Sequence, residues 1–169
     1  MTGLEHLWAT WRAAYVSGES DAAVPDGDGS LFERILGSGR TDEEILVVHR
    51  GRLCVVMLNR FPYTSGHLMV MPKRAVAELE DLDPDEAAEL WDLVRRAVVA
   101  LKTAYSPDGV NIGMNLGRAA GAGVSEHLHV HVLPRWLGDT NFMTTVSGTR
   151  VLPEALDVTW RKVRDAWPR

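Results

Sequence analysis

Apolar residues recur along the chain with two different periods, and the longer period predicts one long helix. Residues 85–105 place apolar side chains at three- and four-residue spacing, as one buried face of an α-helix requires. Asp83 is a suitable N-cap, Pro84 suits a first turn and Glu86 can close a capping box. We expect the buried stripe of this helix to consist of Leu90, Leu93, Val94, Val98 and Leu101.

Shorter runs of β-branched and apolar residues predict five strands. Residues 44–59 contain two such runs separated by Gly51, which indicates a hairpin. Residues 66–72 and 109–117 predict the third and fourth strands, and the strict alternation over 127–133 predicts the fifth. Because the long helix interrupts the series of strands, we expect an α+β fold with helices packed on a five-stranded antiparallel sheet.

The two ends of the chain predict further helices. Leu4, Leu7, Trp8, Trp11 and Tyr15 have helical spacing and predict an N-terminal amphipathic helix. The polar, Gly- and Asp-rich residues 17–30 predict a mobile linker. Residues 31–37 predict a short helix, and residues 153–167 predict a C-terminal helix. We therefore expect an N-terminal helix and linker over 1–30 and a folded domain over 31–169.

Composition and charge exclude several kinds of partner. The 169 residues carry a formal net charge of −5 and no large basic cluster, which argues against nucleic-acid binding. No apolar run reaches the length of a membrane span, so no membrane partner is expected. The single cysteine, Cys54, lies in an apolar run, and a buried free thiol suits a reducing compartment. With no signal-peptide pattern at the N-terminus, we expect a cytoplasmic protein.

His127, His129 and His131 occupy alternate positions and therefore share one face of the predicted fifth strand. The apolar residues between them face the core. The first and third Cα atoms of such a row are roughly 13 Å apart, whereas zinc holds each ligand nitrogen at about 2.0–2.1 Å. The row is therefore a poor single metal site, and no metal-ligating residues are predicted.

A nucleophilic histidine explains the row better. Free imidazole, with a pKa near 6.5, is largely neutral at neutral pH and can attack phosphorus when one ring nitrogen is held. Neighbouring histidines can fix its tautomer and donate to phosphate oxygens. The Gly- and Ala-rich residues 117–124 precede the row, and their backbone N–H groups could cradle phosphate. Plain turn residues remain an equal interpretation of these glycines.

These segments together resemble the histidine triad (HIT) family of nucleotide hydrolases and transferases. "HLHVHVL" satisfies the family's His-x-His-x-His signature, "LNRFPYTSGHLMVMPKR" resembles its upstream segment, and "LDPDEAAELWDLV" resembles the helix that follows. The resemblance covers about residues 45–136 and implies a HIT-like fold. "EHLHVHVLPRWLGDTNF" is especially similar to the bacterial branch described as diadenosine tetraphosphate phosphorylases.

The resemblance gives the four histidines unequal roles. It makes His129 the nucleophile, which forms a covalent nucleotidyl-histidine. It implies that His127 and His131 orient His129 and contact phosphate, and that His67 supports them from the neighbouring strand.

The resemblance also implies a set of substrate-binding residues. They are Asn59, Asn115, Gly121, Ala122, Gly123, Ser125 and Trp136. Asn59 is expected to bind ribose hydroxyls. Asn115 and the turn Gly121–Gly123 resemble the family's α-phosphate-binding region, and Ser125 lies close to them in the sequence. Trp136 corresponds to an aromatic residue near the outer phosphates or second nucleotide, with core packing as the alternative. Lys73, Arg118 and Arg135 are candidates for the outer phosphates or are surface charges.

The implied substrate is a dinucleoside polyphosphate such as diadenosine tetraphosphate, or an AMP derivative. Where a Gly-Gly-Ser turn is expected in the phosphorylase branch, this chain has Gly121-Ala122-Gly123 and lacks the hydroxyl. The Gln that many family hydrolases carry in this turn is missing too. Phosphate and water therefore both stay open as the acceptor.

Three alternatives to nucleotidyl transfer on dinucleotides stay open. One is a phosphoramidase or mononucleotide hydrolase, another is a non-catalytic nucleotide-binding module, and the third is a metal-dependent enzyme. For the leading hypothesis no cofactor is required, and Mg²⁺ is expected only as a companion of the polyphosphate. The family fold implies a homodimer whose sheets join side by side.

Overall fold

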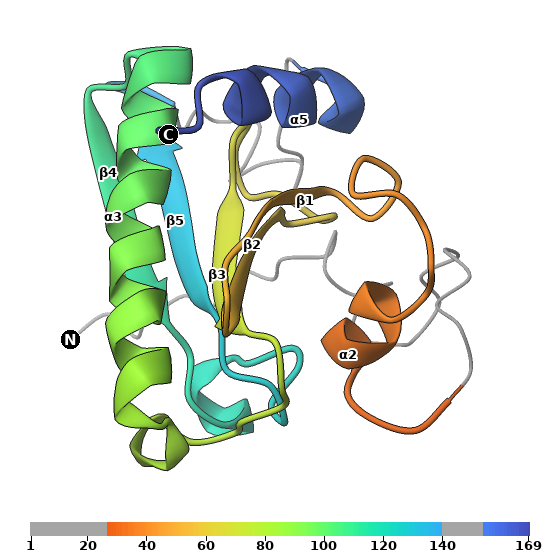
Figure 1. The fold of residues 1–169 in the computed structure, drawn as a ribbon. Helices are drawn as coiled ribbons and strands as arrows, with labels where there is room; N and C mark the ends of the chain where they lie inside the picture. Colours follow the sequence, from red (N-terminus) through yellow and green to blue (C-terminus); the bar gives the residue numbers. More distant parts are fainter. Residues whose placement is uncertain (1–26, 140–153) are drawn as a thin grey trace, which may run out of the picture.

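A computed structural model describes residues 27–139 and 154–169, and its centre is a single antiparallel sheet (Figure 1). The strands are β1 (Val47–Arg50), β2 (Cys54–Leu58), β3 (Leu68–Pro72), β4 (Gly109–Met114) and β5 (Val130–Arg135). Their order in the sheet is β1-β2-β3-β5-β4, and every neighbouring pair is antiparallel. The predicted five-stranded α+β fold is confirmed, and β5 lies inside the sheet.

Helices cover both faces of this sheet. They are α2 (Leu31–Leu36), α3 (Pro84–Tyr105) and α5 (Leu156–Asp165), with short 3₁₀ helices at Leu79–Asp81 and Arg118–Ala120. Helix α3 packs along β2, β3 and β5, α5 crosses one end of the molecule, and α2 lies on the opposite side of the sheet (Figure 1). Within the described ranges, no helix combines the length and apolar character that crossing a membrane requires.

The long helix begins as predicted. Asp83 is its N-cap, and the Asp83 backbone N–H donates to the Glu86 carboxylate at 3.0 Å. Leu90, Leu93, Val94 and Leu101 are buried as expected, but Val98 is only partly buried. Ala97 and Ala100 take its place in the stripe, because these small side chains sit where the helix lies against the sheet.

Alternate residues of the strands enter two separate apolar cores. The core beneath α3 contains residues such as Leu58, Leu68 and Val132. The core beneath α2 contains Phe32, Ile45, Val47, Val55, Met57, Met69, Met71 and Val124. Because both faces are covered, β2 and β3 are buried along their whole length.

Three predicted strands are shorter in the structure, and the third begins at Leu68 and not at residue 66. The fourth ends at Met114, where its pairing with Val130 of β5 ends. The fifth begins at Val130 and not at residue 127, because the preceding backbone pairs elsewhere: the Leu128 N–H donates to the Val76 carbonyl at 2.6 Å. The expected alternation holds nevertheless, since Leu128 and Val132 enter the α3 core.

The ends of the chain are described only in part. The predicted N-terminal helix and residues 17–26 of the predicted linker lie outside the described residues. Ser30, the last residue of that linker, caps α2 with a reciprocal capping box to Glu33. The C-terminal helix is confirmed as α5, and Arg96 of α3 donates to the Pro168 carbonyl at 2.8 Å beyond its end.

Candidate active site

The histidines of the predicted triad lie together at the α2 side of the sheet, with His67 beside them. The ring centroids of His129 and His131 are 4.8 Å apart, and those of His67 and His131 are 5.0 Å apart. Phe32 of α2 packs edge-on against the rings of His127 and His129, at 5.3 Å and 5.5 Å. All four imidazoles are buried, since the most exposed of them, His131, keeps only 8% of its surface accessible.

Backbone groups determine which nitrogen carries the proton along the His67–His131 pair. The Tyr63 backbone N–H donates to His67 Nδ1 at 3.1 Å, so this nitrogen carries no proton. The proton of neutral His67 is then on Nε2, which donates to His131 Nδ1 at 2.9 Å. In neutral His131 the proton must therefore sit on Nε2, as a hydrogen-bond donor.

The same reasoning gives His127 and His129 opposite tautomers. His127 Nε2 lies 2.8 Å from the Pro72 carbonyl and must donate to it, while His127 Nδ1 accepts from the Ser30 hydroxyl at 2.6 Å. His129 Nδ1 lies 2.9 Å from the His127 carbonyl and must also donate. His129 therefore carries its lone pair on Nε2, which makes no hydrogen bond to any described residue.

Burial favours the neutral form of the His127 and His129 rings. Desolvation lowers the pKa of His129 below the ordinary histidine value, and this effect outweighs the hydrogen bond to the His127 carbonyl, which raises the pKa. Desolvation likewise lowers the pKa of His127, against an opposing effect of its hydrogen bond to the Pro72 carbonyl. A neutral imidazole with one nitrogen held and the other carrying a lone pair is the form that can attack phosphorus.

The three triad histidines are thus chemically unequal. His129 presents a lone pair, and His131 carries a proton on Nε2. Both ring nitrogens of His127 are engaged inside the protein. His127 can orient His129 through its carbonyl, but its ring has no nitrogen left for the phosphate contact that the sequence predicts.

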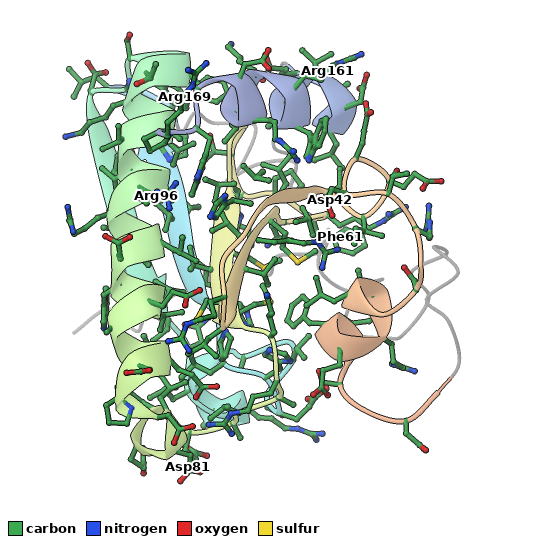
Figure 2. The ribbon with its side chains drawn as sticks, viewed as in Figure 1. Asp42, Phe61, Asp81, Arg96, Arg161 and Arg169 are labelled. Atoms are coloured by element: carbon green, nitrogen blue, oxygen red, sulfur yellow. The ribbon has the colours of Figure 1, made fainter. Side chains whose placement is uncertain are left out.

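Asn59 lies next to the histidines at the end of β2. Its side-chain nitrogen is 3.5 Å from His67 Nδ1, and its side-chain oxygen accepts from the Phe61 backbone N–H at 3.0 Å. Phe61 is on the side of the sheet that carries α2 (Figure 2). The structure therefore brings the predicted ribose-binding residue to the same side as the triad.

The predicted phosphate-binding turn connects β4 to the triad. Asn115 follows the last residue of β4, and Gly121 has a left-handed backbone with φ of +93°. The Gly121 and Ala122 amides bond within the turn, to the carbonyls of Arg118 and Gly117. Across the part of the chain that the structure describes, no partner is found for the amides of Gly123 and Ser125. These amides are available to an oxyanion.

Trp136 lies apart from the histidines, beyond the far end of β5. Its ring meets that of Tyr105 from α3 edge to face, at 6.0 Å between centroids. Arg135 forms a two-bond ion pair with Asp139, at 2.6 Å and 2.7 Å, which fixes this segment. The geometry fits the packing alternative for Trp136.

The cationic candidates Lys73 and Arg118 differ in their surroundings. Lys73 donates to the Gly51 and Arg52 carbonyls at 2.6 Å and 2.9 Å, which ties it to the β1–β2 turn. Arg118 is exposed on its 3₁₀ helix. The two hydrogen bonds of Lys73 give it a structural role at the turn.

Sequence reasoning missed Ser30 and Tyr63. Ser30 touches His127, and the Tyr63 ring lies 4.5 Å from the His67 ring and 5.7 Å from the His131 ring. Ser30 and Glu33 carry the sequence signal of a capping box. That signal predicts the start of a helix but not a contact with a residue far along the chain.

Other reactive groups do not compete with His129. Burial raises the pKa of the Cys54 thiol to about 12, so Cys54 is no nucleophile. Among the residues described, no group of three or more His, Cys, Asp or Glu side chains is arranged to hold a metal ion.

Known proteins resemble this chain in sequence. The HIT domain family model matches residues 40–136. An AP-4-A phosphorylase of Mycobacterium tuberculosis is 42% identical over 167 residues, which cover 98% of this chain and 86% of that protein. A bis(5'-nucleosyl)-tetraphosphatase [asymmetrical] of Schizosaccharomyces pombe is 38% identical over 93 residues, covering 55% of this chain and 50% of that protein.

The fold also matches that of a solved structure. The structure of a hypothetical histidine triad nucleotide-binding protein from Sulfolobus tokodaii superimposes with a TM-score of 0.65 at 28% identity. That superposition covers 80% of this chain and 89% of the other. The matched fold, the histidine row and the family model together show that this chain belongs to the histidine triad (HIT) family.

Proposed function

We propose that the protein is a nucleotidyltransferase that splits dinucleoside polyphosphates of the diadenosine tetraphosphate class through a covalent nucleotidyl-His129 intermediate. The observation that carries this proposal is the state of the His129 ring. Its Nδ1 proton is held by the His127 carbonyl at 2.9 Å, and burial lowers its pKa, so Nε2 is a neutral nucleophile.

In the first step the lone pair of His129 Nε2 attacks the α-phosphorus of the substrate. A phosphorus–nitrogen bond forms as the bond from the α-phosphorus to the bridging oxygen breaks, and that oxygen leaves with its electron pair on ATP when the substrate is diadenosine tetraphosphate. A covalent intermediate divides one difficult displacement into two easier ones.

In the second step an oxygen of inorganic phosphate attacks the same phosphorus. The phosphorus–nitrogen bond breaks, the electron pair returns to His129 Nε2, and ADP is released. The likeness to the mycobacterial phosphorylase supports phosphate as the acceptor, because it extends over 98% of this chain and not only over the HIT domain.

Neutral donors would stabilise the charge that develops on the α-phosphate. We assign this role to the amides of Gly123 and Ser125 and to the Nε2–H of His131, since preorganised donors in a buried site are the main source of such stabilisation. Asn59 would bind the ribose. No protein-bound cofactor takes part in this scheme, and Mg²⁺ would accompany the polyphosphate.

We also infer a homodimer in the cytoplasm. Strand β4 is an edge of the sheet, and no described residue pairs with its outer side. Its Ile112 is 48% exposed, and an apolar exposed edge is a template for pairing with a second copy. At the opposite edge, by contrast, the Trp160 indole donates to the Val47 carbonyl of β1 at 2.8 Å. The buried free thiol of Cys54 suits a reducing compartment.

Product analysis tests the reaction and its acceptor together. Diadenosine tetraphosphate is incubated with the protein, with and without inorganic phosphate, and His129→Ala serves as the control. We expect ATP plus ADP in the presence of phosphate and no turnover by the variant. AMP plus ATP would identify water as the acceptor. Turnover of adenosine phosphoramidate alone would indicate a phosphoramidase, and binding without turnover would indicate a nucleotide-binding module.

A further inference from the structure

Ser30 is joined to the triad although it lies far from it in the sequence. Its hydroxyl oxygen is 2.6 Å from His127 Nδ1, across a separation of 97 residues. Ser30 keeps only 5% of its surface accessible, and His127 is completely buried. Ser30 also lies outside residues 40–136, which the HIT domain model matches. This contact therefore brings an additional segment of the chain to the histidines.

Counting protons gives the direction of the Ser30–His127 bond. The Pro72 carbonyl can only accept, so the single proton of neutral His127 is on Nε2. His127 Nδ1 must then accept, and the Ser30 hydroxyl must donate to it. The lone pairs of the same hydroxyl accept from the Glu33 backbone N–H at 3.2 Å. The Ser30 hydroxyl and both ring nitrogens of His127 therefore each have a hydrogen-bond partner of the matching type, donor to acceptor.

Glu33 fixes Ser30 from the other side. Its carboxylate accepts from the Ser30 backbone N–H at 2.9 Å and from the Ala75 backbone N–H at 3.0 Å. These two backbone hydrogen bonds are the main reason that the pKa of Glu33 is lowered, so it remains a carboxylate. Pro72 is the last residue of β3 and Ala75 follows three residues later, so the same stretch of chain contacts both His127 and Glu33.

We propose that Ser30 is a positioning residue for the nucleophile. Its hydroxyl and the Pro72 carbonyl hold the His127 ring from its two nitrogens, and this keeps the His127 carbonyl on the Nδ1 proton of His129. His129 Nε2 is thereby held as the lone-pair nitrogen. The inference rests on the proposed function for its effect on turnover, but the state of the His127 ring can be measured independently.

Three substitutions separate this role from simple helix capping. Asp caps a helix about as well as Ser, but its carboxylate cannot donate to His127 Nδ1. Ser30→Asp therefore retains the cap and removes the donor, Ser30→Ala removes both, and Ser30→Thr retains both. Ser38→Ala is the matched control, because the Ser38 hydroxyl donates to the Ile35 carbonyl at the other end of α2 at 2.7 Å and does not touch His127.

Steady-state kinetics with diadenosine tetraphosphate and phosphate give the first measurement. We expect Ser30→Asp and Ser30→Ala to lower kcat by about 10-fold or more, as misplacement of reacting groups does, with a much smaller change in KM. Ser30→Thr and Ser38→Ala should retain the wild-type kcat. A Ser30→Asp variant with unchanged kcat would overturn the inference, because the cap alone would then explain Ser30.

Nitrogen-15 NMR of the histidine side chains gives the second measurement. We expect His127 of the wild type to carry one proton, on Nε2, and His127 of Ser30→Asp to carry protons on both nitrogens. A wild-type His127 with its proton on Nδ1 would overturn the inference. If the wild type has no turnover, the proposed function fails, while the NMR measurement still decides whether the Ser30 hydroxyl donates to His127.

Discussion

The unequal chemistry of the histidines originates in three backbone groups. The Tyr63 N–H, the Pro72 carbonyl and the His127 carbonyl each have a fixed polarity, and each fixes the tautomer of the imidazole that it touches. A side-chain partner could reverse its role, whereas a peptide group cannot. The nucleophile is therefore determined by the path of the main chain.

The lowered pKa of His129 predicts the pH dependence of the reaction. Only the neutral ring is nucleophilic, and burial lowers the pKa of this ring below its ordinary value. Activity should therefore persist as pH falls through about 6.5, the ordinary histidine pKa, and should be lost only at lower pH. The measurement is kcat/KM against pH with diadenosine tetraphosphate. An acid limb at or above the ordinary histidine pKa would contradict the assignment.

At the scale of elements, the turn before β3 places His67. Gly66 has φ of +82°, and a Cβ added there would meet Tyr105 at 3.0 Å and both Leu101 and Pro134 at 3.1 Å. A side chain at this position is strained by the backbone and crowded by its neighbours.

Gly66→Ala should therefore lower the free energy of unfolding by roughly 1–3 kcal/mol and reduce kcat, since His67 follows directly in the chain. Gly109→Ala is the matched control, because a Cβ there meets no atom within 4 Å and its φ is not positive. Denaturant unfolding and kinetics of both variants provide the check. Equal stability of the two variants would show that the turn tolerates a side chain.

The sequence predicts local features of these elements well. The helix from Pro84, the hairpin around Gly51 and the two faces of the histidine segment all follow from period and capping residues. The start of β5 cannot be predicted in this way, because it depends on the hydrogen bond from the Leu128 N–H to the Val76 carbonyl. That hydrogen bond forms only once the chain has folded. The hydrogen bond between Ser30 and His127 cannot be predicted from the sequence for the same reason, since a contact across 97 residues produces no periodic pattern.

At the scale of the whole molecule, the exposed β4 edge predicts how two copies associate. Ile112→Asp should convert a dimer into a monomer, because a charge would be buried in the joined sheet. Light scattering coupled to size-exclusion chromatography measures the mass. Val158→Asp is the control, since Val158 of α5 is similarly exposed, at 43% against 48% for Ile112. A monomeric wild type, or a dimeric Ile112→Asp variant, would contradict the proposed interface.

The covalent intermediate is the centre of this account, and trapping it is the most direct test. The protein is mixed with diadenosine tetraphosphate without phosphate, quenched under conditions that preserve the phosphorus–nitrogen bond, and digested for mass spectrometry. We predict an adenylyl group on His129 that disappears when phosphate is added before the quench, and no adduct in His129→Ala. Turnover without any adduct, or an adduct on another residue, would contradict the assignment of His129 as the nucleophile.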